Sequence, residues 1–158
     1  MQLKLLLDTN VWLDYFIDRS AMHDRARDVV LRCIDKDVGL LAALPSVKDC
    51  FFLISQELKR TERSEVGTVS ESAAVAIREV AWSCASSIRK LAYIVPSDES
   101  DMLEAMLLRE AHPDFEDNLV LAAALRAQAD HVVTSDKSLI AHAPMSCLSL
   151  DDTLKLVG

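Results

Sequence analysis

The stretch "LKLLLDTN" (residues 3–10) combines a nearly continuous apolar run with an abrupt polar end. Runs of this kind are typical of strands that are buried on both faces of a parallel sheet. Ligand sites in such sheets gather where the strands end at their carboxyl termini. Asp8 is therefore the first candidate for a functional side chain. The alternative is structural, because Asp8, Thr9 or Asn10 could each cap the helix that we expect next.

Short apolar runs alternate with longer segments of helical period along the whole chain, which predicts βαβ units, an α/β fold and a parallel sheet of about five strands. We expect the strands at residues 3–8, 38–45, 92–96, 131–135 and 147–150. We expect the helices at residues 10–18, 23–36, 46–60, 70–92, 98–111, 115–129, 136–142 and 151–157. Residues 60–69 are expected to form one long polar connection, and residues 1–158 a single domain.

The composition of the chain limits the classes of protein to which it can belong. The chain has 158 residues, a formal net charge of -8 and 51% hydrophobic residues, which suits a soluble domain with its own core. No apolar stretch approaches the roughly 18 residues of a membrane span, and no signal segment is evident, so we expect a cytoplasmic protein without membrane contact. The four cysteines are scattered through apolar segments and are expected to be reduced.

Glycine is scarce, with only three residues in the chain. This excludes a glycine-rich dinucleotide loop, a phosphate-binding P-loop and a glycine-flanked serine nucleophile. The acidic balance also excludes the broad basic surface of a protein that binds duplex DNA tightly.

Three further positions carry acids near predicted strand ends or helix starts. Asp136 follows a strand, and Asp114 and Asp117 share one face at the start of an apolar helix. Asp49 lies one turn into the helix for which Ser46 is the expected N-cap. Each acid has a structural alternative, because acids in the first turn of a helix are favoured by its dipole.

The joint placement of these acids is harder to explain structurally. If the strands are neighbours, Asp8, Asp49, Asp117 and Asp136 converge on one edge of the sheet. Carboxylates so close repel one another unless a cation joins them. Oxygen ligands without histidine or cysteine favour Mg2+ or Mn2+. Asn10, Thr134 and Ser135 have the hydrogen-bonding capacity to orient the carboxylates.

Four motifs in this order, "LLLDTNVWLDYF", "PSVKD", "DFEDNLVLAAA" and "VVTSDKSLI", resemble a PIN domain, the metal-dependent ribonuclease fold of VapC-type toxins. The resemblance spans essentially the whole chain. It implies a three-layer α/β/α fold, a carboxylate cluster that holds Mg2+ or Mn2+, and cleavage of RNA. It also implies a small antitoxin partner, whose C-terminal segment crosses the acidic site, and a homodimer.

The resemblance also assigns roles by position. Asp8, Asp117 and Asp136 match the family's first, third and fourth acids, and Asp114 matches a frequent additional acid. Asn10 and Ser135 match polar residues that support the site. The second acid is most often glutamate, and its position here is Asp49, shorter by one methylene, which could place a water between Asp49 and the metal.

Two other functions remain open at this stage. A haloacid dehalogenase-like phosphatase also needs an acid after its first strand, but it requires a second acid where this chain has Asn10. A PIN-like module that has lost catalysis, and acts only by binding RNA or protein, would share the same motifs. A phospho-aspartate at Asp8 would favour the phosphatase, and RNA affinity without metal-dependent cleavage would favour the binding module.

Overall fold

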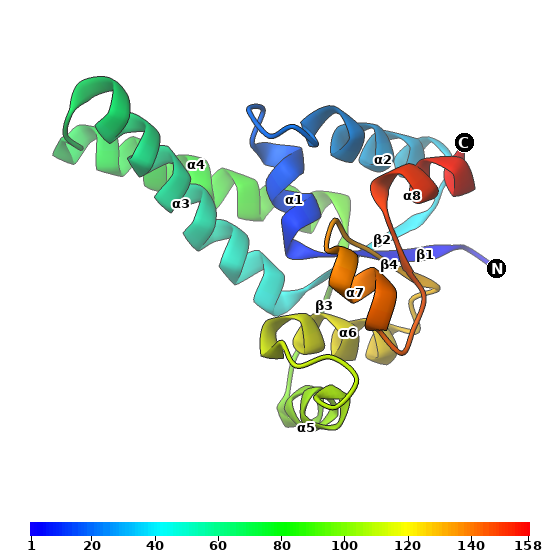
Figure 1. The fold of residues 1–158 in the computed structure, drawn as a ribbon. Helices are drawn as coiled ribbons and strands as arrows, with labels where there is room; N and C mark the ends of the chain where they lie inside the picture. Colours follow the sequence, from blue (N-terminus) through cyan, green and yellow to red (C-terminus); the bar gives the residue numbers. More distant parts are fainter.

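A parallel sheet lies at the centre of the computed structural model, which describes residues 1–158. Its five strands follow the order β3-β2-β1-β4-β5 (Figure 1). The strands are β1 (Lys4–Leu7), β2 (Gly39–Ala43), β3 (Tyr93–Val95), β4 (His131–Val133) and β5 (Cys147–Leu148). Leu6 of β1 pairs with Leu41 on one side and with Val132 on the other. The predicted parallel sheet is therefore confirmed.

Helices cover both faces of this sheet and make the predicted three layers (Figure 1). Their bounds are α1 (Thr9–Phe16), α2 (His23–Asp35), α3 (Leu44–Val66), α4 (Glu71–Leu91), α5 (Glu99–Leu108), α6 (Phe115–Ala127), α7 (Lys137–His142) and α8 (Leu150–Val157). Residues of α1, α2, α3, α4 and α8 pack in one core, and residues of α5, α6 and α7 pack in the other. The two cores lie on opposite faces of the sheet.

The central strand β1 shows why the sheet is buried on both sides. Leu5 and Leu7 belong to the core formed with α1 and α2, whereas Leu6 belongs to the core formed with α6. All three side chains are fully buried. Because successive side chains of a strand point to opposite faces, a continuous leucine run serves both cores at once.

The direction in which strands are added reverses between β1 and β4. From β1 the chain adds β2 and then β3 on one side, and it later adds β4 and β5 on the other side. In open α/β sheets the crevice at such a reversal, outside the carboxyl ends of the strands, is where ligands bind. Asp8 directly follows β1, and its backbone N–H donates to the carbonyl of Val133 at the end of β4 (2.9 Å).

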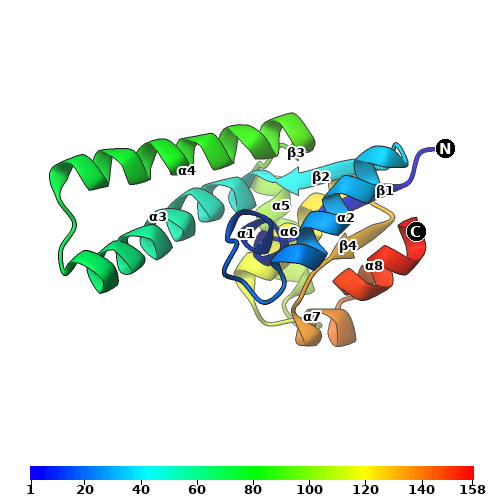
Figure 2. The same cartoon turned by 90° about the horizontal axis from the view of Figure 1, so that it is seen from above.

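The helical hairpin of α3 and α4 differs from the prediction. Residues 60–69 were expected to be a polar connection, but α3 continues to Val66 and the connection is much shorter. The two helices pack along one another and extend away from the sheet, so much of the surface of α3 there faces solvent (Figure 2). A helix in that position carries polar residues on most of its faces and resembles a loop in composition.

The start of α3 also differs from the prediction. The helix begins at Leu44, with Pro45 in its first turn and Ala43 at the N-cap. Ser46 was expected to be the N-cap and is instead inside the helix, where its buried hydroxyl accepts a hydrogen bond from Thr9 Oγ1 (2.9 Å). Proline fits this first turn because its missing N–H would have no partner there.

All four cysteines are free, as predicted. None of the helices combines the length and the apolar composition that crossing a bilayer requires.

Gly67 ends α3 in a left-handed conformation (φ 93°), in which a residue with a Cβ is strained. We expect Gly67→Ala to lower the free energy of unfolding by about 1 kcal/mol. A matched control is Gly39→Ala, because a Cβ at that position meets its nearest atoms at an ordinary 3.5 Å and φ is not positive. Urea denaturation of both variants tests this, and equal stability of the two would contradict it.

Candidate functional site

Asp8 is a buried carboxylate held by hydrogen bonds from both flanking segments. Its Oδ1 accepts from the backbone N–H of Thr9 (2.7 Å), as expected for the residue that precedes α1. Its Oδ2 accepts from Thr134 Oγ1 (2.8 Å) and from Asn10 Nδ2 (3.1 Å). Asp8 is therefore a helix cap, but two side chains also orient the oxygen that the cap does not use.

Ionisation of Asp8 is unfavourable in this environment. Burial raises the pKa of Asp8 to about 6, and the charges of Asp117 and Asp136 also raise it, although hydrogen bonds from Thr134 and Thr9 oppose the change. Such a shift at a sheet edge, with specific charged neighbours, is typical of functional carboxylates.

Hydrogen bonds join Asn10, Thr134 and Ser135 around Asp8. Asn10 Nδ2 also donates to Thr134 Oγ1 (3.3 Å), and Asn10 Oδ1 accepts the backbone N–H of Ser135 (3.2 Å). The side chain of Asn10 thus connects the ends of β1 and β4. Ser135 contributes its backbone to this network, and Thr134 contributes its hydroxyl.

Asp136 is the N-cap of α7, and its Oδ1 accepts the N–H groups of Ser138 (2.8 Å) and Leu139 (3.2 Å). Its own N–H donates to Thr134 Oγ1 (3.1 Å), so the same hydroxyl contacts both Asp8 and Asp136. The capping alternative is correct for Asp136, but the cap occupies only one of its two oxygens.

Asp114 and Asp117 have different positions at the start of α6. Asp114 is the exposed N-cap, and its Oδ1 accepts the backbone N–H of Asp117 (3.0 Å). Asp117 is partly buried, and burial raises its pKa, as do the charges of Asp114 and Asp136, whereas a hydrogen bond with His112 lowers it. Asp117 is therefore the partly buried acid of this pair. Asp114 stays exposed, and its charge helps to raise the pKa of Asp117.

Asp49 forms an ion pair with Lys48, its neighbour in the chain, which the sequence did not predict. Lys48 Nζ lies 2.6 Å from Asp49 Oδ1, and this hydrogen bond, together with the charges of Asp49 and Glu116, raises the pKa of Lys48. Adjacent residues on a helix do not normally face each other, so the pair was not expected.

Asp8, Asp49 and Asp117 line one cavity of about 190 Å³, which we call the acidic cavity. Its walls are Asp8, Thr9, Asn10, Leu13, Asp49, Leu53, Glu116, Asp117 and Val120. Asp114 and Asp136 are not among them. Glu116 is, and it was missed because its exposed position in the first turn of α6 is indistinguishable from ordinary placement of an acid near a helix dipole.

The donor set fits a hydrated Mg2+ or Mn2+, because it consists of carboxylate and amide oxygens. However, no group of three or more Asp, Glu, His or Cys side chains is arranged tightly enough to enclose an ion directly. Mg2+ keeps several of its waters when it is bound by one or two carboxylates. The spacing therefore suits an ion held partly through water.

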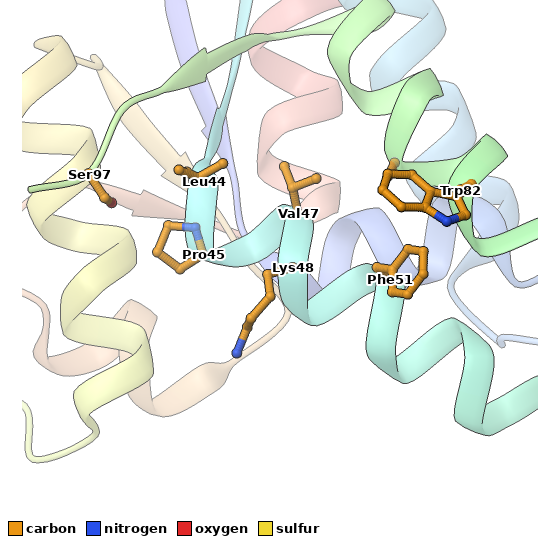
Figure 3. A pocket seen from close by; sticks show the side chains of 8 residues that line it. Leu44, Pro45, Val47, Lys48, Phe51, Trp82 and Ser97 are labelled. Carbon is orange, nitrogen blue, oxygen red and sulfur yellow. The ribbon is translucent and has the colours of Figure 1, made fainter. Parts of the chain in front are cut away.

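An apolar groove of about 600 Å³ lies along the start of α3 (Figure 3). Phe51 of α3 and Trp82 of α4 meet at one end of it in an edge-to-face contact, with ring centroids 5.2 Å apart. Ser97 lies at the other end, and Lys48 belongs to both the groove and the ion pair with Asp49. Trp12, in contrast, is fully buried in the core and cannot stack on a ligand.

A comparison with protein families decides the family. The model of a family described as the PIN domain matches residues 4–138. The chain belongs to the PIN domain family. No curated protein matches this PIN domain in sequence.

Solved structures with the same fold include VapC-type proteins of low sequence identity. VapBC2 from Rickettsia felis, solved with a DNA fragment from its promoter, has a TM-score of 0.64 at 12% identity, covering 93% of this chain and 98% of that one. VapC20 from Mycobacterium tuberculosis, a toxin that cleaves the sarcin-ricin loop, has a TM-score of 0.55 at 16% identity, with 88% and 95% covered. PAE2754 from Pyrobaculum aerophilum has a TM-score of 0.57 at 16% identity, with 99% and 96% covered.

The pKa of Asp8 makes the stability of this PIN domain depend on pH. An acid whose pKa is raised by folding favours the folded state when protonated, so stability falls as pH rises from about 4 to about 6. Asp8 alone corresponds to about 3 kcal/mol across this range. We expect Asp8→Asn to remove this part of the pH dependence, measured by urea denaturation in chelator on both sides of pH 6. If the free energies of unfolding of wild type and Asp8→Asn change with pH in parallel, the raised pKa of Asp8 is contradicted.

Proposed function

We propose that this PIN domain is a Mg2+- or Mn2+-dependent endoribonuclease that hydrolyses RNA phosphodiester bonds, and that it is the toxin of a VapBC-type pair acting in the cytoplasm. The observation that carries the proposal is the position of Asp8 between the ends of β1 and β4. There its buried carboxylate is oriented by Thr134 and Asn10, and burial raises its pKa, with a smaller contribution from the charges of Asp117 and Asp136.

Asp8, Asp117 and Asp136 would hold the metal ion, with Asp49 and Asp114 completing the negative charge around it. When bound, the ion would polarise the phosphodiester and lower the pKa of a water molecule. Thr134 and Asn10 keep Asp8 Oδ2 in a fixed orientation through their hydrogen bonds. Asp49 would also accept a proton from the attacking water.

Lys48 is the cation that would contact RNA. It is exposed, its ammonium pairs with Asp49 of the acidic cavity, and it lies near Glu116. A phosphate arriving at the cavity would find a positive charge there in a protein of net charge -8. The acidic surface elsewhere favours a substrate contacted locally.

The partner that we propose is a small antitoxin whose basic side chain enters the acidic cavity. The apolar groove between Trp82 and Ser97 offers adjacent surface for its apolar residues (Figure 3). An arginine fits a cavity of several carboxylates, since it forms paired charge-assisted hydrogen bonds. We also propose a homodimer, as the VapC resemblance implies.

The phosphatase alternative is disfavoured by both the family and the site. It requires a proton-donating acid at residue 10, where Asn10 instead connects Asp8 with Thr134 and Ser135. The binding-module alternative predicts RNA affinity without cleavage, which the following experiment distinguishes.

We expect Asp8→Asn to abolish metal-dependent cleavage, because the amide keeps the shape of the side chain but not its charge. The measurement is cleavage of a mixed RNA pool by purified protein with Mg2+, Mn2+ or chelator. Asp28→Asn is the control, since Asp28 is an exposed acid of α2 outside the acidic cavity. Near-normal activity of Asp8→Asn, or equal loss in the control, would contradict the proposed function.

Lys48 competes with a metal ion for Asp49. We expect Lys48→Met to tighten Mn2+ binding by about three- to tenfold, because the substitution removes a positive charge next to Asp49. Isothermal titration calorimetry at low salt measures this. Lys59→Met is the matched control, because this lysine of α3 has no ion pair. Unchanged or weaker binding by Lys48→Met would show that the pair does not limit access of the ion.

A further inference from the structure

His112 is a buried imidazole with a single polar partner, and that partner is Asp117. The residue is 4% exposed and lies between α5 and α6. Its Nε2 is 2.7 Å from Asp117 Oδ2, whereas its Nδ1 is buried without any hydrogen-bond partner. A buried polar atom without a partner is unfavourable by about 1–3 kcal/mol. The hydrogen bond with Asp117 is the only one that this buried ring makes.

The backbone fixes the position of the ring from both sides. The N–H of His112 donates to the carbonyl of Leu108 in α5 (3.0 Å). Its carbonyl accepts Asn118 Nδ2 in α6 (2.7 Å), and Asn118 is itself 1% exposed. Pro113 follows and restricts the backbone of His112 further. The imidazole is therefore held rigidly against the first turn of α6.

The unpartnered nitrogen identifies which nitrogen carries the hydrogen. A hydrogen on Nδ1 would have no acceptor, and the lone pair of Nε2 would then face the Asp117 carboxylate. A hydrogen on Nε2 instead forms a charge-assisted hydrogen bond with Asp117 Oδ2. The geometry thus makes His112 the donor and Asp117 the acceptor.

This contact leaves Asp117 with one committed oxygen and one free oxygen. His112 occupies Oδ2, and no other hydrogen bond reaches the carboxylate, so Oδ1 remains for the acidic cavity that Asp117 lines. The hydrogen bond from His112 restrains the rotation of the carboxyl group about its Cβ–Cγ bond. Hydrogen bonds to ligating groups of this kind change metal affinity by about 10- to 100-fold.

We propose that His112 is a positioning residue that fixes Asp117 Oδ2 through its Nε2–H and thereby presents Asp117 Oδ1 to a divalent cation in the acidic cavity. The inference rests on the proposed function, since it assigns a role toward the same site. His112 does not touch the substrate or the ion and acts only through Asp117.

Calorimetric titration with Mn2+ tests this role without measuring cleavage. We expect His112→Phe, which keeps a buried ring but lacks the N–H, to bind Mn2+ about 10- to 100-fold more weakly than wild type. His112→Gln, which keeps an N–H donor, is expected to recover most of the affinity. In an Asp117→Asn background, His112→Phe is expected to cause no further loss, because its action passes through Asp117.

A measurement on the metal-free wild-type protein is independent of folding in the variants. The 15N chemical shifts of the His112 ring are expected to show a hydrogen on Nε2. A hydrogen on Nδ1 alone would overturn the proposal.

The binding results separate two failures. Wild type that binds Mn2+ while His112→Phe binds it equally well would overturn only the role of His112. If His112→Phe lowers Mn2+ affinity by the same factor in the Asp117→Asn background, the role of His112 is also overturned, because His112 would then not act through Asp117. Wild type that binds no Mn2+ would overturn the proposed function, and the role of His112 with it.

Discussion

The hydrogen bond from Thr134 Oγ1 to Asp8 Oδ2 joins the carboxyl ends of the two strands between which the sheet reverses direction. Both residues are buried, with Asp8 4% exposed. A buried carboxylate is tolerated only where donors surround it, and here those donors come from the first turn of α1 and from the segment after β4. The acid therefore constrains both segments, and they in turn set its orientation.

The site is consequently assembled from elements that are distant in sequence but adjacent at one sheet edge. Asp8 follows β1 and Asp49 lies in α3 after β2, while Asp117 enters from α6. Each element is held by its own core packing, since Val11, Cys50 and Val120 next to these acids are buried. Packing of this density fixes side chains more firmly than a loop could.

Local patterns explain what the sequence could predict. The leucine run before Asp8 and the apolar run before Asp136 identify strand ends, and a strand end is a local feature. The polar C-terminal part of α3 was misassigned because its composition reflects exposure to solvent, which depends on where the hairpin projects.

Contacts that require the folded chain were not predictable in the same way. His112 meets Asp117 only because the segment before α6 turns back on itself, and no periodicity signals such a turn. Lys48 and Asp49 are neighbours that should point apart on an ideal helix. Asn118, which holds the carbonyl of His112, has the appearance of an ordinary polar residue in a helix.

Lys48 contributes to the apolar groove and also neutralises Asp49. The two surfaces therefore share one charge and cannot be thermodynamically independent. A ligand in the groove that draws the ammonium away from Asp49 would leave the neighbouring cavity more negative and so increase its affinity for cations. By linkage, a cation that displaces the ammonium from Asp49 would favour the same ligand by an equal factor.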